Sequence, residues 1–266
     1  MGRRPRLSHT RHDGAASSDG RWFAGSLARP EGHEADRTTL VLWRADNGRR
    51  ERILDGQAAP ITVLSFSADS TVLASAGLRS SDVWLWDIPS GEPKLILTGA
   101  VEGCSVEALA FHPAGRLLAV GGIDWLAPRG AEGQIALWDL VERRVVATLP
   151  EGSGSLAFHP SGRYLAAATL TQTIHLWDVT TRKQRLELAG HLDAVTCVVY
   201  SPDGRWLASG SDDRTVRLWD PDSGMQHGLV ELDTQIKALA FAPDGRSLFT
   251  GNGTTSCYQL DARQLL

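Results

Sequence analysis

The stretch Ser209–Asp220 reads Ser-Gly-Ser-Asp-Asp-Arg-Thr-Val-Arg-Leu-Trp-Asp, and it decides the fold. It holds the end of one strand, a tight polar turn at Asp212–Arg214 and a second strand, Thr215–Trp219, that closes on Asp220. Two β-rich runs joined by a short polar turn are typical of a hairpin. Degraded copies recur along the chain, so the sequence predicts a repeated β architecture that presents a surface.

Two marks return in the same order in each copy. The first is a turn such as Tyr-Ser-Pro-Asp-Gly-Arg at 200–205, in which Pro fixes φ and Gly takes the left-handed position. Its aromatic residue recurs at 66, 111, 158, 200 and 241, at spacings of 45, 47, 42 and 41 (111−66, 158−111, 200−158, 241−200). The second mark is the strand ending in Trp-Asp, which appears complete or altered at Trp43, Trp86, Trp138, Trp177, Trp219 and Leu260. Without any convincing helical periodicity, four short strands per unit indicate a propeller blade.

The chain resembles the WD-repeat β-propeller family from about residue 14 to its end, because turn, strand, turn and Trp-Asp recur together in order. The resemblance implies an all-β fold, a β-propeller of four-stranded antiparallel blades with about six repeats visible. A closed six-bladed ring and an incomplete seven-bladed ring both stay open. Residues 1–13 are expected to be a basic N-terminal tail or closing strand, and 14–266 the propeller. The family closes its ring with an N-terminal strand, for which residues around Arg6–Thr10 are the candidates.

The fifth repeat carries the full family form, and the resemblance gives four of its residues a structural role. In the family, side chains at the positions of Trp219, Ser209, His191 and Asp213 form a hydrogen-bonded chain. The other repeats are incomplete at these positions: Gln57 replaces the histidine of the second repeat, and Gly121 is assigned to the serine position of the third. Five blades are therefore expected to depend more on apolar packing than on this polar chain.

The same four residues include the ingredients of a nucleophilic triad, Ser209, His191 and Asp213. No Gly-x-Ser-x-Gly elbow surrounds the serine, and nothing nearby suggests an oxyanion hole. We therefore interpret the set as structural and expect no catalytic residue. His112 and His159, each before a proline, are interpreted as turn residues, and no metal or cofactor site is expected.

Composition restricts the partners. A formal net charge of −4 and a pI near 6.1 argue against a general nucleic-acid or anionic-membrane binder, and no apolar window approaches 18 residues. Cys104, Cys197 and Cys257 are widely spaced and form no Cys-x-x-Cys pair. They are expected to be reduced, which predicts a cytoplasmic protein.

Two insertions lengthen the connection between the second and third strands of a repeat. Trp138 lies 52 residues after Trp86 (138−86), against 42 from Trp177 to Trp219 (219−177). The excess is mainly in residues 123–133, and the first repeat has a matching insertion at 27–37. Because both connections are of one type, both are expected on the same face of the disc. The residues predicted to bind a partner there are Trp125, Arg129, Arg29, Glu31 and His33.

These observations predict a non-catalytic scaffold that presents a propeller surface to a partner protein or peptide. One alternative is a sensor or regulatory fragment of a larger signalling protein. The other is a small-molecule or hydrolytic site in the central channel, although inner strands such as Ala194–Val199 offer few titratable groups. The sequence identifies neither the partner nor the oligomeric state.

Overall fold

The computed structural model describes residues 14–27, 39–57, 59–124, 126, 132–169, 171–253 and 256–262. These residues form 23 strands joined by turns and loops, with no helix among them. The part of the chain so described accordingly holds no helix of the length and apolarity needed to cross a membrane. The expected all-β class is confirmed.

The strands form six antiparallel sheets, one for each repeat, and we call them blades 1 to 6. Blade 1 holds β1 (Gly14–Ala16), β2 (Trp22–Leu27), β3 (Thr39–Arg44) and β4 (Arg50–Leu54). Blade 2 holds β5 (Ile61–Phe66), β6 (Val72–Gly77), β7 (Val83–Asp87) and β8 (Pro93–Leu97). Blade 3 holds β9 (Ser105–Phe111), β10 (Leu117–Asp124), β11 (Glu132–Asp139) and β12 (Arg144–Pro150).

The second half of the chain repeats this order. Blade 4 holds β13 (Ser155–Phe158), β14 (Tyr164–Ala168), β15 (Thr173–Asp178) and β16 (Lys183–Ala189). Blade 5 holds β17 (Val195–Tyr200), β18 (Leu207–Ser211), β19 (Thr215–Trp219) and β20 (Gln226–Glu231). Blade 6 holds β21 (Ile236–Phe241), β22 (Ser247–Asn252) and β23 (Cys257–Asp261), so its described part has three strands.

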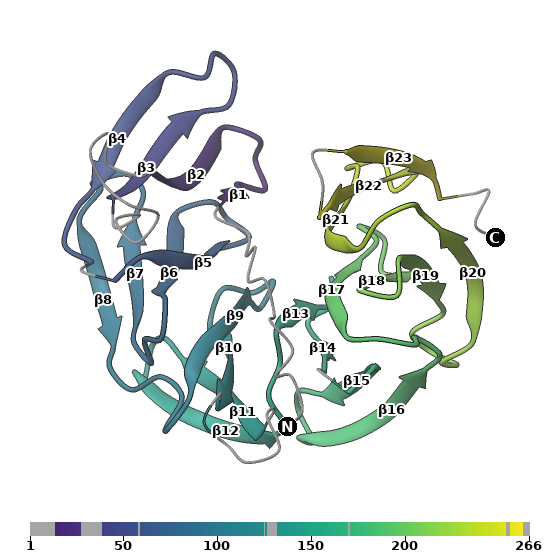
Figure 1. The fold of residues 1–266 in the computed structure, drawn as a ribbon. Helices are drawn as coiled ribbons and strands as arrows, with labels where there is room; N and C mark the ends of the chain where they lie inside the picture. Colours follow the sequence, from purple (N-terminus) through teal and green to yellow (C-terminus); the bar gives the residue numbers. More distant parts are fainter. Residues whose placement is uncertain are drawn as a thin grey trace, which may run out of the picture.

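The first strands of the blades lie innermost, and successive blades contact one another through them. Figure 1 shows the blades arranged around a common centre as an arc, with blade 1 and blade 6 on either side of an opening. The contacts of β1 with β5 and of β17 with β21 have no counterpart of similar extent between β1 and β21. The described residues therefore form a six-bladed propeller with an open arc; the expected closing strand, Arg6–Thr10, lies outside them.

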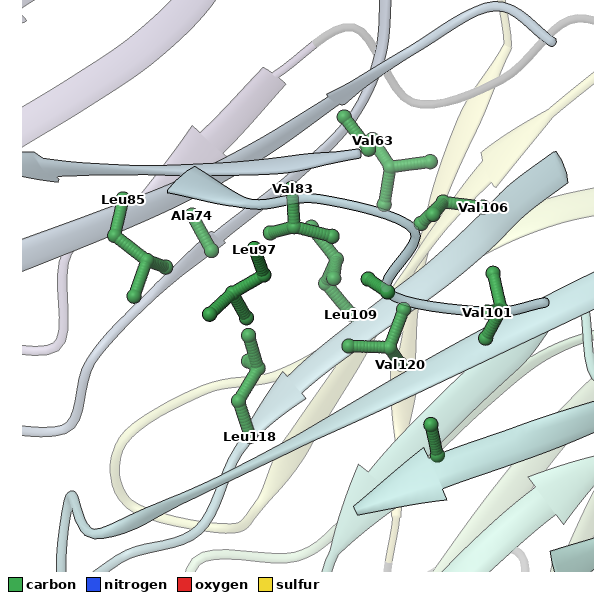
Figure 2. Packing of buried hydrophobic residues seen from close by; sticks show 13 residues of the cluster. Val63, Ala74, Val83, Leu85, Leu97, Val101, Val106, Leu109, Leu118 and Val120 are labelled. Carbon is green, nitrogen blue, oxygen red and sulfur yellow. The ribbon is translucent and has the colours of Figure 1, made fainter. Parts of the chain in front are cut away.

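Apolar packing between neighbouring blades forms the core. Figure 2 shows the cluster between blades 2 and 3, where Val63, Val83 and Leu85 of one sheet meet Leu109 and Leu118 of the next. Four more clusters of this kind occur along the arc, and each joins two consecutive blades. An interior blade consequently buries both faces; every residue of β18 and β19 is buried.

The turn between the first and second strands has the geometry that the repeated motif predicts. Gly115, Gly162 and Gly204 have φ values of 74°, 76° and 75°, in the left-handed region that glycine enters without a steric penalty. In blade 2, Ser70 occupies this position at φ 59°, and its hydroxyl accepts a hydrogen bond from the Asp19 N–H of blade 1.

His112 and His159 connect consecutive blades through these turns. The Nε2 atom of His112 lies 3.0 Å from the carbonyl oxygen of Gly162, and its Nδ1 accepts from the Ala114 N–H. His159 repeats the arrangement, with its Nε2 3.1 Å from the Gly204 oxygen. These partners assign the proton to Nε2, which then donates to the next blade. Both residues lie in turns, and each also joins its own blade to its neighbour.

We expect His159→Ala to lower the free energy of unfolding by about 1 kcal/mol, because it removes a hydrogen bond between blades and leaves the Gly204 carbonyl without it. Urea unfolding followed by tryptophan fluorescence would measure the change. The control is His227→Ala, since exposed His227 makes a ring contact with Trp206 within its own blade. Equal effects of the two substitutions would contradict a linking role for His159.

Candidate functional site

The four residues of the fifth repeat lie together in blade 5 as one hydrogen-bonded chain. Trp219 Nε1 donates to Ser209 Oγ over 2.8 Å, and Ser209 Oγ lies 2.7 Å from His191 Nε2. His191 Nδ1 lies 2.9 Å from Asp213 Oδ2. Since the serine receives the indole proton, it donates its own to Nε2, and His191 donates from Nδ1 to the carboxylate. Every polar atom in this chain has a partner of the complementary kind.

Asp213 anchors the chain through more contacts than the four-residue motif predicts. Its carboxylate also accepts from the backbone N–H groups of Leu192 and Thr215 and from the Thr215 hydroxyl, at 2.6–2.9 Å. Thr215 and its neighbour Arg217, which donates to Gln226, were not identified from the sequence. The sequence signal that could have identified them is their position two and four residues after Asp213, which places both side chains on the same face of one strand.

Burial and hydrogen bonding set the charges of this pair. Burial is the largest influence on His191 and lowers the pKa of its imidazole, against the nearby Asp213 carboxylate, which raises it. Burial acts to raise the pKa of Asp213, but hydrogen bonds from Thr215, the Leu192 N–H and His191 together hold it well below its usual range. The resting state is therefore a neutral histidine beside an ionised aspartate.

Ser209, His191 and Asp213 make the hydrogen bonds of a catalytic triad, but the serine is not accessible to a substrate. Ser209 is 0% exposed, and the side chain of His191 is 1% exposed. A nucleophile must reach its substrate, whereas the Ser209 hydroxyl is enclosed and already donates to one group and accepts from another. In the described part of the chain, no three His, Cys, Asp or Glu side chains are grouped to hold a metal ion.

Other blades satisfy their tryptophan by different means. In blade 2, Trp86 Nε1 donates to Ser75 Oγ at 2.8 Å, and Ser75 donates to Gln57 Oε1 at 2.6 Å. Gln57, buried at the histidine position, thus replaces the imidazole as acceptor. This repeat lacks the histidine of the family form, yet it retains a buried polar network through Ser75 and Gln57.

The assignment of Gly121 to the serine position of blade 3 was also wrong. The strand register pairs Trp138 with Leu118, as it pairs Trp219 with Leu207, so the residue equivalent to Ser209 is Val120. With no hydroxyl there, Trp138 Nε1 donates instead to the backbone carbonyl of Ala100, over 3.0 Å. The pairing of β10 with β11 has no register shift, so this assignment is unambiguous.

The face that carries the two insertions is the second part of the candidate site. We define the upper face as the turns between the second and third strands together with the linkers between blades. The insertions begin after β2 and β10 and end at β3 and β11, so both leave from this face. The predicted binding residues themselves lie outside the described residues: Trp125, Arg129, Arg29, Glu31 and His33.

Described residues of the upper face include exposed leucines. Leu78 is 41% exposed, Leu192 78% and Leu126 93%. Asp82, Asp193 and Asp124 lie in or next to the same turns and linkers, and exposed Arg79 directly follows Leu78. Sequence reasoning missed these leucines; the available signal is a large apolar residue inside an otherwise polar turn, as in Leu192 directly after His191.

A family model described as "WD domain, G-beta repeat" matches residues 182–220, the repeat with the complete hydrogen-bonded chain. The chain belongs to the WD-repeat β-propeller family. A second model, described as "Eukaryotic translation initiation factor eIF2A", matches residues 35–174 of this WD-repeat propeller, more than half of the chain.

Curated relatives of the WD-repeat propeller match parts of it. It is 32% identical over 121 residues to pre-mRNA-processing factor 19 of Bos taurus, covering 44% of this chain and 22% of that protein. It is 23% identical over 147 residues to target of rapamycin complex subunit LST8 of Bos taurus, covering 54% and 42%. Autophagy-related protein 16 of Arabidopsis thaliana is 27% identical over 162 residues, covering 60% and 30%. The matched region thus spans less than half the length of each of these relatives.

We expect Ser209→Ala to destabilise the propeller by about 1–3 kcal/mol, because it leaves Trp219 Nε1 and His191 Nε2 buried without their partner. Chemical denaturation would measure the loss, with Ser90→Ala, in an exposed turn, as control. A fluorophosphonate probe should leave Ser209 of the folded wild type unlabelled. Labelling at Ser209 would contradict the structural role.

His191→Gln places in blade 5 the residue type that blade 2 has at this position. It removes the titrating imidazole while keeping a polar side chain of similar length. Since the pKa of His191 is lowered in the folded state, the unfolded state binds more protons as pH falls below the ordinary histidine pKa, and stability decreases there. We expect His191→Gln to retain more stability than His191→Ala and to flatten the change in unfolding free energy between about pH 7 and 5. An unchanged slope in both variants would contradict this assignment.

Proposed function

We propose that this WD-repeat propeller is a non-catalytic scaffold that binds a partner protein or peptide on its upper face. WD-repeat proteins generally act as interaction scaffolds, and one similar protein is named as a subunit of a complex. Fold alone does not fix function, so the proposal needs a surface. The observation that carries it is the exposure of Leu78, Leu126 and Leu192 on the face from which both insertions leave.

Such a surface favours association with another protein. Leu192 and Leu126 are 78% and 93% exposed, and a partner that removes these apolar side chains from water lowers the free energy of the complex. They come from three blades, so a partner that covers all of them crosses the face rather than contacting one loop. The linkers and turns beside them carry Asp55, Glu102 and Asp233 in addition to the acidic residues named above.

The partner segment that suits this face carries apolar side chains together with Lys or Arg. The apolar groups would cover the leucines, and the cations would lie beside the carboxylates. We include the predicted residues of the two insertions, Trp125, Arg129, Arg29, Glu31 and His33, in the proposed binding surface. Since the electrostatic part is exposed to solvent, binding is expected to weaken at higher salt.

The closed environment of Ser209 and His191 supports a non-catalytic role, and no observation favours a reaction in the channel over binding. We also propose that the protein functions in the cytoplasm. The free thiols support this, because Cys104, Cys197 and Cys257 belong to different blades and form no disulfide.

Affinity purification with mass spectrometry would test the upper face. We expect Leu192→Ser with Leu78→Ser, and separately Trp125→Ala with Arg129→Ala, to reduce recovery of the same partner at least tenfold. The matched control is Val141→Ser with Met225→Ser, because these exposed apolar residues lie in turns of the opposite face. Partner recovery that falls only in the control variant, or in no variant, would exclude this surface.

A further inference from the structure

One register position on the second strand of each blade shows how completely that blade is covered. It is the residue paired with the tryptophan position of the third strand, and in blades 2 to 6 it is a leucine that is 0% exposed: Leu73, Leu118, Leu165, Leu207 and Leu248. In blade 1 it is Phe23, paired with Trp43 and 44% exposed.

The next residue along the strand shows the same pattern at the other end of the arc. In blades 1 to 5 it is an alanine that is 0% exposed: Ala24, Ala74, Ala119, Ala166 and Ala208. In blade 6 it is Phe249, 43% exposed. Both exceptions therefore replace a completely buried aliphatic residue by a partly exposed phenylalanine, and they occur only at the two end blades.

Both phenylalanines lie on the sheet faces turned to the opening. Ala24 packs in the cluster shared with blade 2, and successive side chains of a strand point to opposite faces, so Phe23 faces away from blade 2. Leu248 packs in the cluster shared with blade 5, so Phe249 faces away from blade 5. Figure 1 shows that blades 1 and 6 flank the opening.

Apolar groups surround each phenylalanine on its own face. In blade 1, the ring of Trp43 lies 5.8 Å from that of Phe23, and Ile53 on the same face is 45% exposed, while Val41, which pairs with Ile53, is buried. In blade 6, Phe249 pairs with exposed Ala240, and exposed Cys257 pairs with Gly251, two residues further along the strand. We call these two surfaces the opening faces.

The remaining interfaces of the molecule show what covers such a face. Each interior sheet is covered on both sides by another β-sheet. The contacts include the positions equivalent to Phe23 and Phe249, which are partly exposed on the opening faces. A sheet with apolar side chains on both faces would continue this series between blade 6 and blade 1. We propose that the opening is a docking site for a β-sheet segment of a partner protein, apolar on both faces, that packs as an additional blade.

Other occupants fit less well. A second copy of this chain could offer only an end sheet, and its five other blades would follow into the space of blade 1 or blade 6. Residues 1–13 contain Arg3, Arg4, Arg6 and Arg11 and lack the alternating apolar residues that two apolar faces require. The opening is separate from the upper face, so a test of this proposal is independent of a test of the proposed function.

Cys257 is a natural reporter, because its thiol lies on the opening face of blade 6. Burial raises the pKa of Cys104, and that of buried Cys197 to about 12, so a thiol reagent at neutral pH reports mainly on exposed Cys257. The probe is a soluble carrier protein that bears residues 188–231 of this chain, the complete repeat. Its control is the same carrier with Leu207→Asp and Ala208→Asp in the repeat, which breaks both apolar faces.

We expect the full-length protein to bind the probe with Cys257 at least tenfold less reactive, and not to bind the control probe. Phe23→Asp and Phe249→Asp should each weaken binding about tenfold or more, while Val141→Asp and Met225→Asp leave it unchanged. To remove dependence on folding of the isolated repeat, the same residues fused to the end of the full chain should also protect Cys257 and raise the Tm.

Two results would overturn the proposal. In the first, neither the free nor the fused repeat protects Cys257. In the second, light scattering finds a dimer of the wild-type protein that Phe249→Asp dissociates, which would make a second copy the occupant.

Discussion

Apolar contact between neighbouring sheets is the interaction on which this structure depends. A four-stranded sheet with apolar side chains on both faces is stable in water only when both are covered, and here each sheet covers the next. The completely buried residues at equivalent positions of successive blades, such as Leu73 and Leu165, show how regularly this packing repeats. The polar motif that marks the family is fitted into this packing and does not replace it.

The polar networks of blades 2, 3 and 5 each provide a hydrogen-bond acceptor for a tryptophan, but from different groups. A tryptophan near the end of the third strand brings an N–H group into the blade, and that donor needs an acceptor. Ser209 supplies it in blade 5, Ser75 with Gln57 in blade 2, and the backbone carbonyl of Ala100 in blade 3. Because the indole N–H needs only some acceptor, different residues can supply it while the blade geometry is retained.

The architecture was predictable because its signals are local. A turn motif and a Trp-Asp ending each depend on a few adjacent residues, and their order implies four strands per blade. The contacts between blades were not predictable in the same way. His112 and Gly162 are 50 residues apart, and their hydrogen bond exists only when two turns are placed side by side. The misassignment of Gly121 had no such cause, because Val120 lies nine residues after Phe111 (120−111), as Ser209 lies nine after Tyr200 (209−200). The exposure of Phe249 follows from its place at an end of the arc, which no local pattern encodes.

An arc with two free ends is energetically a linear array, whereas a closed ring has no terminal member. Interior blades must break two interfaces to leave the array, but blades 1 and 6 must break one each. Amide hydrogen exchange is therefore expected to be fastest in the terminal blades and slowest near β9 to β16, where neighbours protect both sides. The hydrogen bond of His112 lies within this central region and that of His159 joins it to blade 5, so cooperativity is concentrated in the middle of the chain and fades toward both ends.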